Sequence, residues 1–375
     1  MSGSDVSKDV ERVRSAFARA AQRAATGSAR RDRRVEDILE GDTPTFMELP
    51  LAAKPEDLAG ADAAVMGFGY EGITIKTPLL AAPATVSRPP RGSAYWRMGA
   101  DKAPAAIRTY SLYYSIHHNQ GWYPEIDPTL TIFDHIRVVD YGDVCVEPAD
   151  TALTMRRASD KVGEIVKAGA LPIVLGGDHT IPFPTLRGIY EQSGARVGVI
   201  SFDAHMDLSD TPEYWASTEW VKSFELGCVS PDNFVEIGIR SNRSTNFERI
   251  VAEELGIRVY NIDEVKCVGM QAVIEDAVAR ACRGVDALYV SVDIDVMEPG
   301  LCPAQKAPEF WGLTVDEMMI AMRHVCAQPL AGLDICEHTP DYDVNGMGAQ
   351  FCARLVVEAL AGLAQRRRAE RKSEG

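Results

Sequence analysis

Short apolar runs alternate with longer amphipathic segments from about Asp62 onwards. Runs rich in Val, Ile, Leu and aromatic residues, bounded by Gly, Asp or Asn, predict buried strands. Eight segments have this character: DAAVMGFG, IRVVDYGD, LPIVLGG, RVGVISFD, NFVEIGIR, IRVYNID, ALYVSVDID and LAGLDICE. Segments with helical spacing lie between several of them, such as TALTMRRASDKVGEIVKAG and GMQAVIEDAVARACRG. This alternation predicts an α/β domain with a mostly parallel central sheet covered on both faces.

The two ends of the chain differ from this pattern. Apolar residues recur at helical spacing between Val6 and Phe17 and are followed by a polar, basic stretch, so residues 1–44 are predicted to form a helical, amphipathic and basic arm. Its apolar stripe needs a cover, which is either the main domain, a neighbouring subunit or a docking partner. We expect residues 45–366 to form one domain, followed by a charged tail at 367–375.

Composition narrows the class of partner. The chain has 39 Lys and Arg against 54 Asp and Glu, so its formal charge is 39 − 54 = −15. This charge disfavours a nucleic-acid or anionic membrane surface and suits a small cationic ligand. The 8 cysteines include no C-x-x-C pair, which is typical of reduced thiols, and no apolar run reaches the ~18 residues of a membrane span. We therefore expect a cytoplasmic protein without a membrane partner.

Acidic residues and histidines gather where four of the predicted strands end. In a parallel sheet, ligands bind beyond the carboxyl ends of the strands. Because alternate residues of an extended segment share one face, Asp203, His205 and Asp207 can converge on one point. The residues at the four strand ends are Asp178 and His179, then Asp203, His205 and Asp207, then Asp293 and Asp295, and finally Glu337 and His338.

Several carboxylates cannot stay ionised together in a half-buried site without a compensating cation. Carboxylate oxygens mixed with imidazole nitrogens suit divalent manganese, nickel, cobalt or zinc. A single D-x-D pair is more often an ordinary loop, but three such strand ends in one chain favour a metal centre. Two ions sharing Asp203 and Asp293 would use all six candidate ligands. These six are His179, Asp203, His205, Asp207, Asp293 and Asp295.

The motifs GGDHT (176–180), SFDAHMD (201–207) and SVDIDVMEP (291–299) resemble the three metal-binding signatures of the ureohydrolases, the family of arginase and agmatinase. GADKAPAAIR, VVDYGDV, EIGIR, GLT at 312–314 and GLDICEHTP extend the resemblance over most of the core. It implies an arginase-like, three-layer α-β-α fold and a binuclear metal centre. It further implies hydrolysis of C–N bonds in a guanidino group, giving urea and an amine.

The resemblance also implies roles for individual residues. Glu337 matches the carboxylate that holds the substrate guanidinium, which suits the planar geometry of that cation. Asp207 would orient the attacking water and carry a proton towards the departing nitrogen. By position, His179 and Asp207 would bind one ion, His205 and Asp295 the other, and Asp203 and Asp293 would bridge them.

Departures from the family pattern point to a particular substrate. Residues 208–240 contain no histidine where the family usually has one, and Glu219 lies near that position as a substitute. Phe310 and Trp311 stand where small residues are common and could cover an alkylated cation by cation–π contact. The long N-terminal extension and EHTPDYD are similar to the nickel-dependent branch of guanidine hydrolase and the metformin hydrolase subunits. We therefore predict a small guanidine or biguanide as substrate and nickel, or alternatively manganese, as cofactor.

Two alternatives stay open. The chain could be an agmatinase or guanidino-acid hydrolase. The loop after Asp207 does not resemble that of arginase, which argues against arginine as the substrate. It could instead be a non-catalytic partner subunit in a hetero-oligomer, although all six candidate ligands are present. The resemblance implies a homo- or hetero-oligomer, usually a trimer or hexamer.

Overall fold

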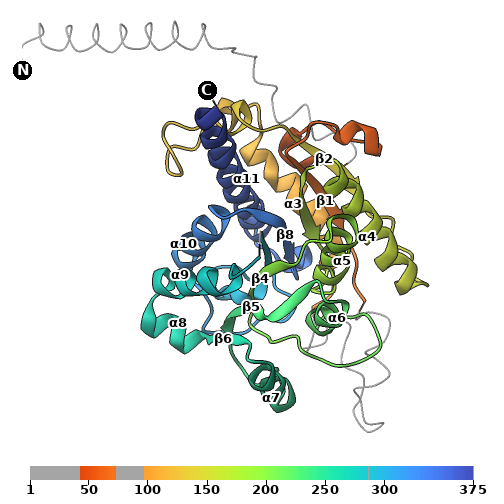
Figure 1. Cartoon of the computed structure of the whole chain (residues 1–375), viewed down its shortest axis with the longest axis vertical. Helices are drawn as coiled ribbons and strands as arrows, with labels where there is room; N and C mark the ends of the chain where they lie inside the picture. The colour runs from red at the N-terminus through yellow and green to blue at the C-terminus, as the bar shows by residue number, and fades with distance from the viewer. Residues whose placement is uncertain (1–42, 73–96, 286, 375) are drawn as a thin grey trace, which may run out of the picture. The chain divides into compact units, whose positions relative to one another are not determined.

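The structure, a computed structural model, describes residues 43–72, 97–285 and 287–374. All eight predicted strands form and lie in one sheet (Figure 1). The predicted N-terminal arm, except for its last two residues, lies outside the described residues. The strands are β1 (Ala63–Phe68), β2 (Val138–Asp143), β3 (Leu171–Gly176), β4 (Val197–Phe202), β5 (Val229–Ile239), β6 (Arg258–Asn261), β7 (Leu288–Asp293) and β8 (Leu330–Cys336).

Every pair of neighbouring strands is parallel, and the order across the sheet is β2-β1-β3-β8-β7-β4-β5-β6. All residues of β1, β3, β4 and β7 are buried, which explains why these strands read as continuous apolar runs. Alternate side chains still enter different cores. Ala63 and Val65 of β1 belong to one hydrophobic cluster, whereas Ala64 and Met66 belong to another.

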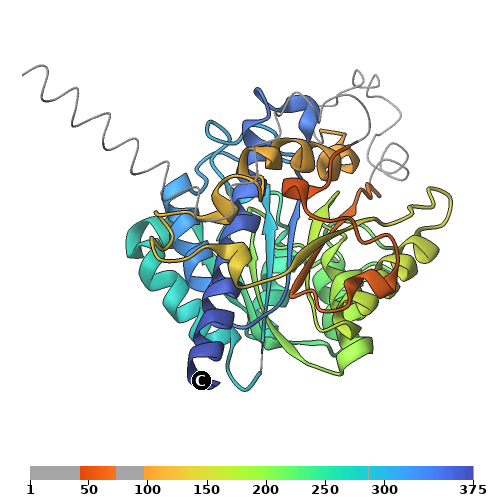
Figure 2. The same ribbon diagram turned by 90° about the horizontal axis from the view of Figure 1, so that it is seen from above.

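Helices cover both faces of the sheet, as Figure 2 shows, so the predicted three-layer arrangement is confirmed. One core contains α3 (Ala103–Ser111), α8 (Ile262–Val268), α9 (Met270–Ala281), α10 (Val315–Cys326) and α11 (Met347–Glu374). The other core contains α4 (Thr151–Lys167), α5 (Pro182–Ser193), α6 (Glu219–Leu226) and α7 (Asn246–Leu255). The helical segments predicted from the sequence correspond to α4 and α9.

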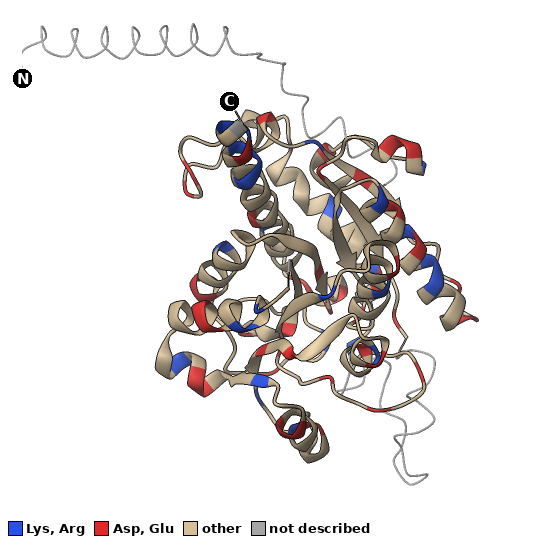
Figure 3. Cartoon of the chain, in the orientation of Figure 1, with Lys and Arg blue, Asp and Glu red and all other residues tan. Residues whose placement is uncertain are grey.

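Helix α11 differs from the sequence-based expectation in two ways. The sequence suggested no segment long and apolar enough to cross a membrane, whereas α11 is long and apolar enough by length and composition. However, 78% of its most apolar window is buried inside the fold, as in the core helix of a globular domain. The predicted charged tail continues this helix as far as Glu374. Arg367 and Arg368 pair with Asp62 and Asp127 at 3.0 and 2.7 Å, so the charges of the tail bind the domain. Figure 3 shows the basic residues at this end of α11.

Candidate metal centre

Four neighbouring strands bring the predicted site residues to one edge of the sheet. β3, β8, β7 and β4 are adjacent, and their carboxyl ends meet at the same edge. His179 follows β3, Glu337 follows β8, Asp293 ends β7 and Asp203 follows β4. The structure therefore places the six candidate ligands and Glu337 together, although they come from segments up to 158 residues apart.

The segment after β4 converges by a turn rather than by continued strand geometry. β4 ends at Phe202, one residue before Asp203. The N–H of His205 donates to Asp203 Oδ1 at 2.6 Å, and Asp207 has a φ of 50°. A positive φ is uncommon for a residue other than Gly, although Asp adopts it more readily than most residues do. The three residues that the alternation selected do lie in one cluster, but a left-handed turn rather than extended geometry brings Asp207 into it.

Asp203 contacts both histidines of the site through different oxygens. Its Oδ2 lies 2.9 Å from His179 Nδ1, and its Oδ1 lies 3.5 Å from His205 Nδ1. Asp207 and Asp293 approach His179 Nδ1 at 2.9 and 3.5 Å. Asp295 Oδ2 lies 3.1 Å from His205 Nδ1. The cluster thus has two centres, one at each histidine, and Asp203 belongs to both.

The electrostatics of this cluster fit divalent cations. Asp203 Oδ2 and Glu219 Oε1 are buried without a hydrogen-bond partner in the described part of the chain. Burial raises the pKa of Asp293 well above its usual value, and the charges of Asp295 and Asp203 raise it further. Burial also raises the pKa of Asp203, with Asp207 and Asp295 adding to the effect. At Asp203 and Asp293 the protein alone therefore favours the protonated carboxyl, whereas the pKa values of Asp207 and Asp295 are lowered beside the two histidines. Bound cations would keep all four carboxylates ionised as ligands.

A second layer of hydrogen bonds fixes the ring of His179. Ser291 Oγ donates to Asp334 Oδ1 at 2.8 Å and lies 3.0 Å from His179 Nε2. Because the single hydroxyl proton is donated to Asp334, Nε2–H of His179 is the donor to Ser291. Nδ1 is then the ring nitrogen that points at the carboxylates, where it would be available as a metal ligand. The metal signatures did not single out Ser291 or Asp334; a polar residue inside an apolar run was the available signal.

Glu219 lies in the cluster, where the sequence offered it as a substitute for the missing histidine. It begins α6, and its side chain is fully buried. Its Oε2 accepts from the N–H of Ser217 at 2.8 Å, and its Oε1 lies 3.6 Å from His179 Nδ1. Burial, with the charge of Asp207, raises the pKa of Glu219 well above its usual value. His179, Asp207 and Glu219 also have the spacing of a ligand group.

Glu337 is held beside His179 in a strained conformation. Its φ is 62°, and its N–H donates to the carbonyl of Gly177 at 2.8 Å. Its Oε1 accepts from the N–H of His179 at 2.7 Å. The side chain is buried, and a lysine that the sequence did not single out, Lys306, lies 3.8 Å from Oε1. Glu337 is therefore fixed at the edge of the cluster without belonging to the ligand groups.

Phe310 and Trp311 do not contact the candidate ligands. Their exposed fractions are 76% and 59%. Trp311 Nε1 donates to Asp263 Oδ1 at 2.9 Å, and the carbonyl of Phe310 accepts from Arg240 at 3.1 Å. Both aromatic rings are open to solvent, so their predicted role in substrate binding has no contact to support it in this structure.

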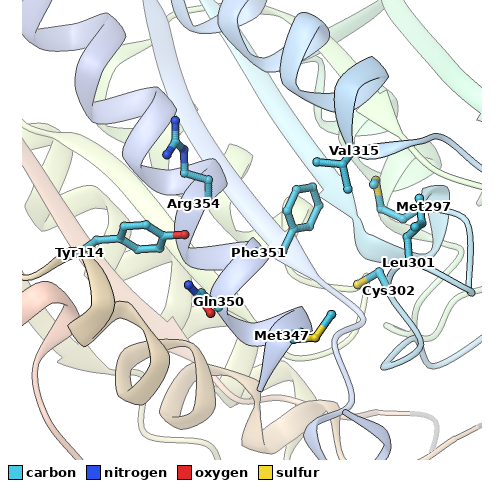
Figure 4. A pocket seen from close by; sticks show the side chains of 9 residues that line it. All are labelled: Tyr114, Met297, Leu301, Cys302, Val315, Met347, Gln350, Phe351 and Arg354. Carbon is cyan, nitrogen blue, oxygen red and sulfur yellow. The ribbon is translucent and has the colours of Figure 1, made fainter. Parts of the chain in front are cut away.

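A pocket of about 260 Å³ lies elsewhere on the domain (Figure 4). Met347, Phe351 and Arg354 of α11 line one part of it, and Met297 and Leu301 line another. None of the six candidate ligands lines this pocket. We therefore locate the candidate active site at the carboxyl ends of the four central strands and not in the pocket.

Comparisons with known proteins agree with this fold. Residues 83–362 match the arginase family. Guanidinopropionase of Pseudomonas aeruginosa is 30% identical over 327 residues, which cover 86% of this chain and 92% of that protein. Proclavaminate amidinohydrolase of Streptomyces clavuligerus is 30% identical over 330 residues, covering 87% and 95%.

Solved structures show the same architecture. The structure of the Streptomyces clavuligerus proclavaminate amidinohydrolase has a TM-score of 0.72 and 29% identity, and the match covers 87% of this chain and 98% of that one. The manganese-bound formiminoglutamase of Trypanosoma cruzi has a TM-score of 0.71 at 21% identity, covering 86% and 99%, and supports the fold alone.

These matches confirm the resemblance to ureohydrolases, the arginase-like fold and the prediction of a hydrolase that acts on C–N bonds of amidines. Arginase-family enzymes use a binuclear metal centre, which agrees with the two-centred cluster around Asp203. The family match covers more than half of the sequence, and this chain belongs to the arginase family.

Proposed function

We propose that this chain is a binuclear-metal hydrolase that cleaves the guanidino group of a small cationic guanidine or biguanide. Guanidine, dimethylguanidine and metformin are the substrates of this class that we favour, with urea or a urea-like product and an amine as products. The observation that carries the proposal is Asp203, whose two oxygens face two different histidines next to a buried Glu337. Complete sets of ligand side chains also count against a non-catalytic partner subunit.

The candidate ligands divide into two sets with two shared members, as the family pattern implies. His179 and Asp207 would hold one ion, and His205 and Asp295 the other, with Asp203 and Asp293 serving both. The contact of Asp293 with His179 is compatible with that role. The mixed oxygen and nitrogen ligands accept both nickel and manganese, and the general affinity order favours nickel.

The residues around the ions would bind the substrate and move the proton. When bound, the two ions would supply the Lewis acidity that makes water a competent nucleophile at neutral pH. Glu337 would hold the planar guanidinium by charge-assisted hydrogen bonds. Asp207 would orient the water and carry its proton towards the departing nitrogen. Glu219, within reach of the same histidine as Asp207, would accept or return that proton.

An agmatinase or guanidino-acid hydrolase remains the second candidate because of the relatives. Guanidinopropionase and guanidinobutyrase of Pseudomonas aeruginosa are 30% and 29% identical to this chain, and agmatinase of Gallus gallus is 31% identical over a shorter region. We also propose that residues 1–44 form an amphipathic arm, that the protein assembles as a trimer or hexamer and that it is cytoplasmic. The acidic balance of the chain supports a cationic substrate.

The test is a substrate panel with two metals. The purified chain, loaded with nickel or manganese, is assayed for urea and amine release from guanidine, dimethylguanidine, metformin, agmatine, guanidinobutyrate and arginine. We expect turnover of a small or alkylated guanidine with nickel. Preferred turnover of agmatine or guanidinobutyrate would establish the second candidate. Bound metal without any turnover across the panel would contradict catalysis by this chain alone.

The role of Glu219 leads to a separate prediction. Glu219→Gln keeps the shape of the side chain and an acceptor for the Ser217 N–H, but it cannot carry a proton. We expect kcat to fall by ~10–100-fold with little change in KM, because loss of a group beside the metal ligands has effects of this size. Steady-state kinetics check this, with Glu225→Gln on the exposed side of α6 as the control. An unchanged kcat would remove Glu219 from the proposed mechanism.

A further inference from the structure

Lys306 is a fully buried lysine next to the candidate active site. Its side chain is 0% exposed. Its ammonium group lies 3.4 Å from Glu71 Oε1, 3.7 Å from Asp178 Oδ2 and 3.8 Å from Glu337 Oε1. A lysine is almost never buried completely unless it is paired, so these three carboxylates account for its position.

The three carboxylates are themselves held by the backbone. Each of them accepts a hydrogen bond from a backbone N–H at 3.3 Å or less. The donors are Gly99 for Glu71, Gly72 for Asp178 and His179 for Glu337. The ammonium group therefore sits in a rigid frame of negative charge and can orient the carboxylates that surround it.

The backbone of Lys306 reinforces the contact with Glu337. The N–H of Lys306 donates to the carbonyl of Glu337 at 3.0 Å. Next to it, Gln305 and His338 form an isolated bridge, and the N–H of Thr339 donates to the carbonyl of Ala304 at 2.8 Å. The loop that carries Lys306 thus pairs with the segment that carries Glu337. This pairing supports the unfavourable positive φ of Glu337.

The charge of Lys306 excludes a role as a general base. Burial alone would lower its pKa, but Glu337, Asp178 and Glu71 outweigh that effect and raise it. The side chain therefore stays an ammonium ion at neutral pH. A fixed cation at this place neutralises part of the charge around Glu337 and attracts its Oε1.

We propose that Lys306 is a positioning residue for the substrate: its ammonium group attracts Oε1 of Glu337 across a 3.8 Å ion pair and so leaves the rest of the carboxylate directed towards the guanidinium. This inference rests on the proposed function, in which Glu337 binds the guanidinium. The His179 N–H donates to Oε1 of Glu337 at 2.7 Å, and the Lys306 ammonium group faces the same oxygen at 3.8 Å, an ion-pair distance that is too long for a hydrogen bond. Oε2 then remains for the substrate.

The first test replaces the charge and keeps the volume. Lys306→Met in the metal-loaded enzyme is expected to raise KM for the best guanidine substrate at least tenfold, with a smaller change in kcat and with the metal content of the wild type. Lys167→Met, at the exposed end of α4 and at the opposite edge of the sheet, is the matched control and should leave both constants unchanged. An unchanged or lower KM for Lys306→Met would overturn the proposal.

The second test restores the charge from solution. Lys306→Ala lacks three methylenes and the ammonium group, which together correspond to propylammonium. Propylammonium is expected to lower the raised KM of Lys306→Ala, whereas propanol, which fills the space without a charge, is expected to have little effect. Equal rescue by both compounds, or by neither, would contradict the positioning role.

Binding measurements separate this inference from the proposed function. Titration calorimetry with guanidinium on the metal-loaded wild type needs no turnover. If the wild type neither binds nor cleaves a guanidine, the proposed function fails and the inference fails with it. If the wild type does both and Lys306→Met does so equally well, only the inference is overturned.

Discussion

Replacing Asp203 by alanine is expected to abolish catalysis and empty the metal centre. Asp203 is fully buried and faces both His179 and His205, so its loss affects both ion positions. Loss of a residue that only supports a metal ligand costs ~10–100-fold in affinity or activity. Loss of a shared ligand should exceed ~100-fold in kcat/KM. Metal analysis and substrate kinetics on the purified variant measure both effects.

The appropriate control for that variant is Asp210→Ala. Asp210 lies in the same SFDAHMDLSD segment but is exposed and outside the ligand groups. It should keep the metal content and the kinetic constants of the wild type. If Asp203→Ala retained two ions and its activity, the assignment of Asp203 as the shared ligand would be wrong.

Glu337→Gln is expected to abolish substrate binding while the metals remain. The substitution keeps the size of the side chain but removes the charge that would pair with the guanidinium. Removing one partner of a buried charge pair costs ~3–5 kcal/mol, which corresponds to ~10²–10³-fold or more in kcat/KM. Glu337 lies outside the ligand groups, so bound metal should stay at the wild-type level. Kinetics with the preferred guanidine and metal analysis measure the two effects.

Glu254→Gln, an exposed substitution on α7, controls for the change of a glutamate to glutamine. Loss of metal together with loss of activity in Glu337→Gln would contradict the separation of substrate binding from metal binding. The same variant also leaves Lys306 with one charged partner fewer. A modest decrease in thermal stability is therefore expected beside the kinetic effect.

The sequence predicted the sheet and the cluster because both depend on local patterns. β3, β4 and β7 are buried on both faces, so each reads as an apolar run, and the ligand candidates follow these runs directly. The strand β4 ends at Phe202, before the candidate ligands begin. The i, i+2, i+4 spacing of Asp203, His205 and Asp207 nevertheless identified them as candidates. Local pattern and family motif together were sufficient to find these side chains.

Other features depend on contacts between distant segments, which no local pattern records. Lys306 stands in the loop CPAQKAPEF, where a lysine reads as a surface residue, yet it is buried by Glu71 and Asp178 from other parts of the chain. The charged residues after Arg366 read as a tail, but Arg367 pairs with Asp62, 305 residues away. Phe310 and Trp311, predicted from their loop position to lie near the substrate, are exposed, and that role stays a prediction.

The positive φ of Asp207 has a consequence for how this enzyme could evolve. A left-handed conformation costs a residue other than glycine ~1–2 kcal/mol. Asp207→Gly would relieve this backbone strain. Selection for heat tolerance alone would thus favour glycine at the position that catalysis needs as aspartate. Stability and activity compete at this residue, and only selection for turnover preserves the carboxylate.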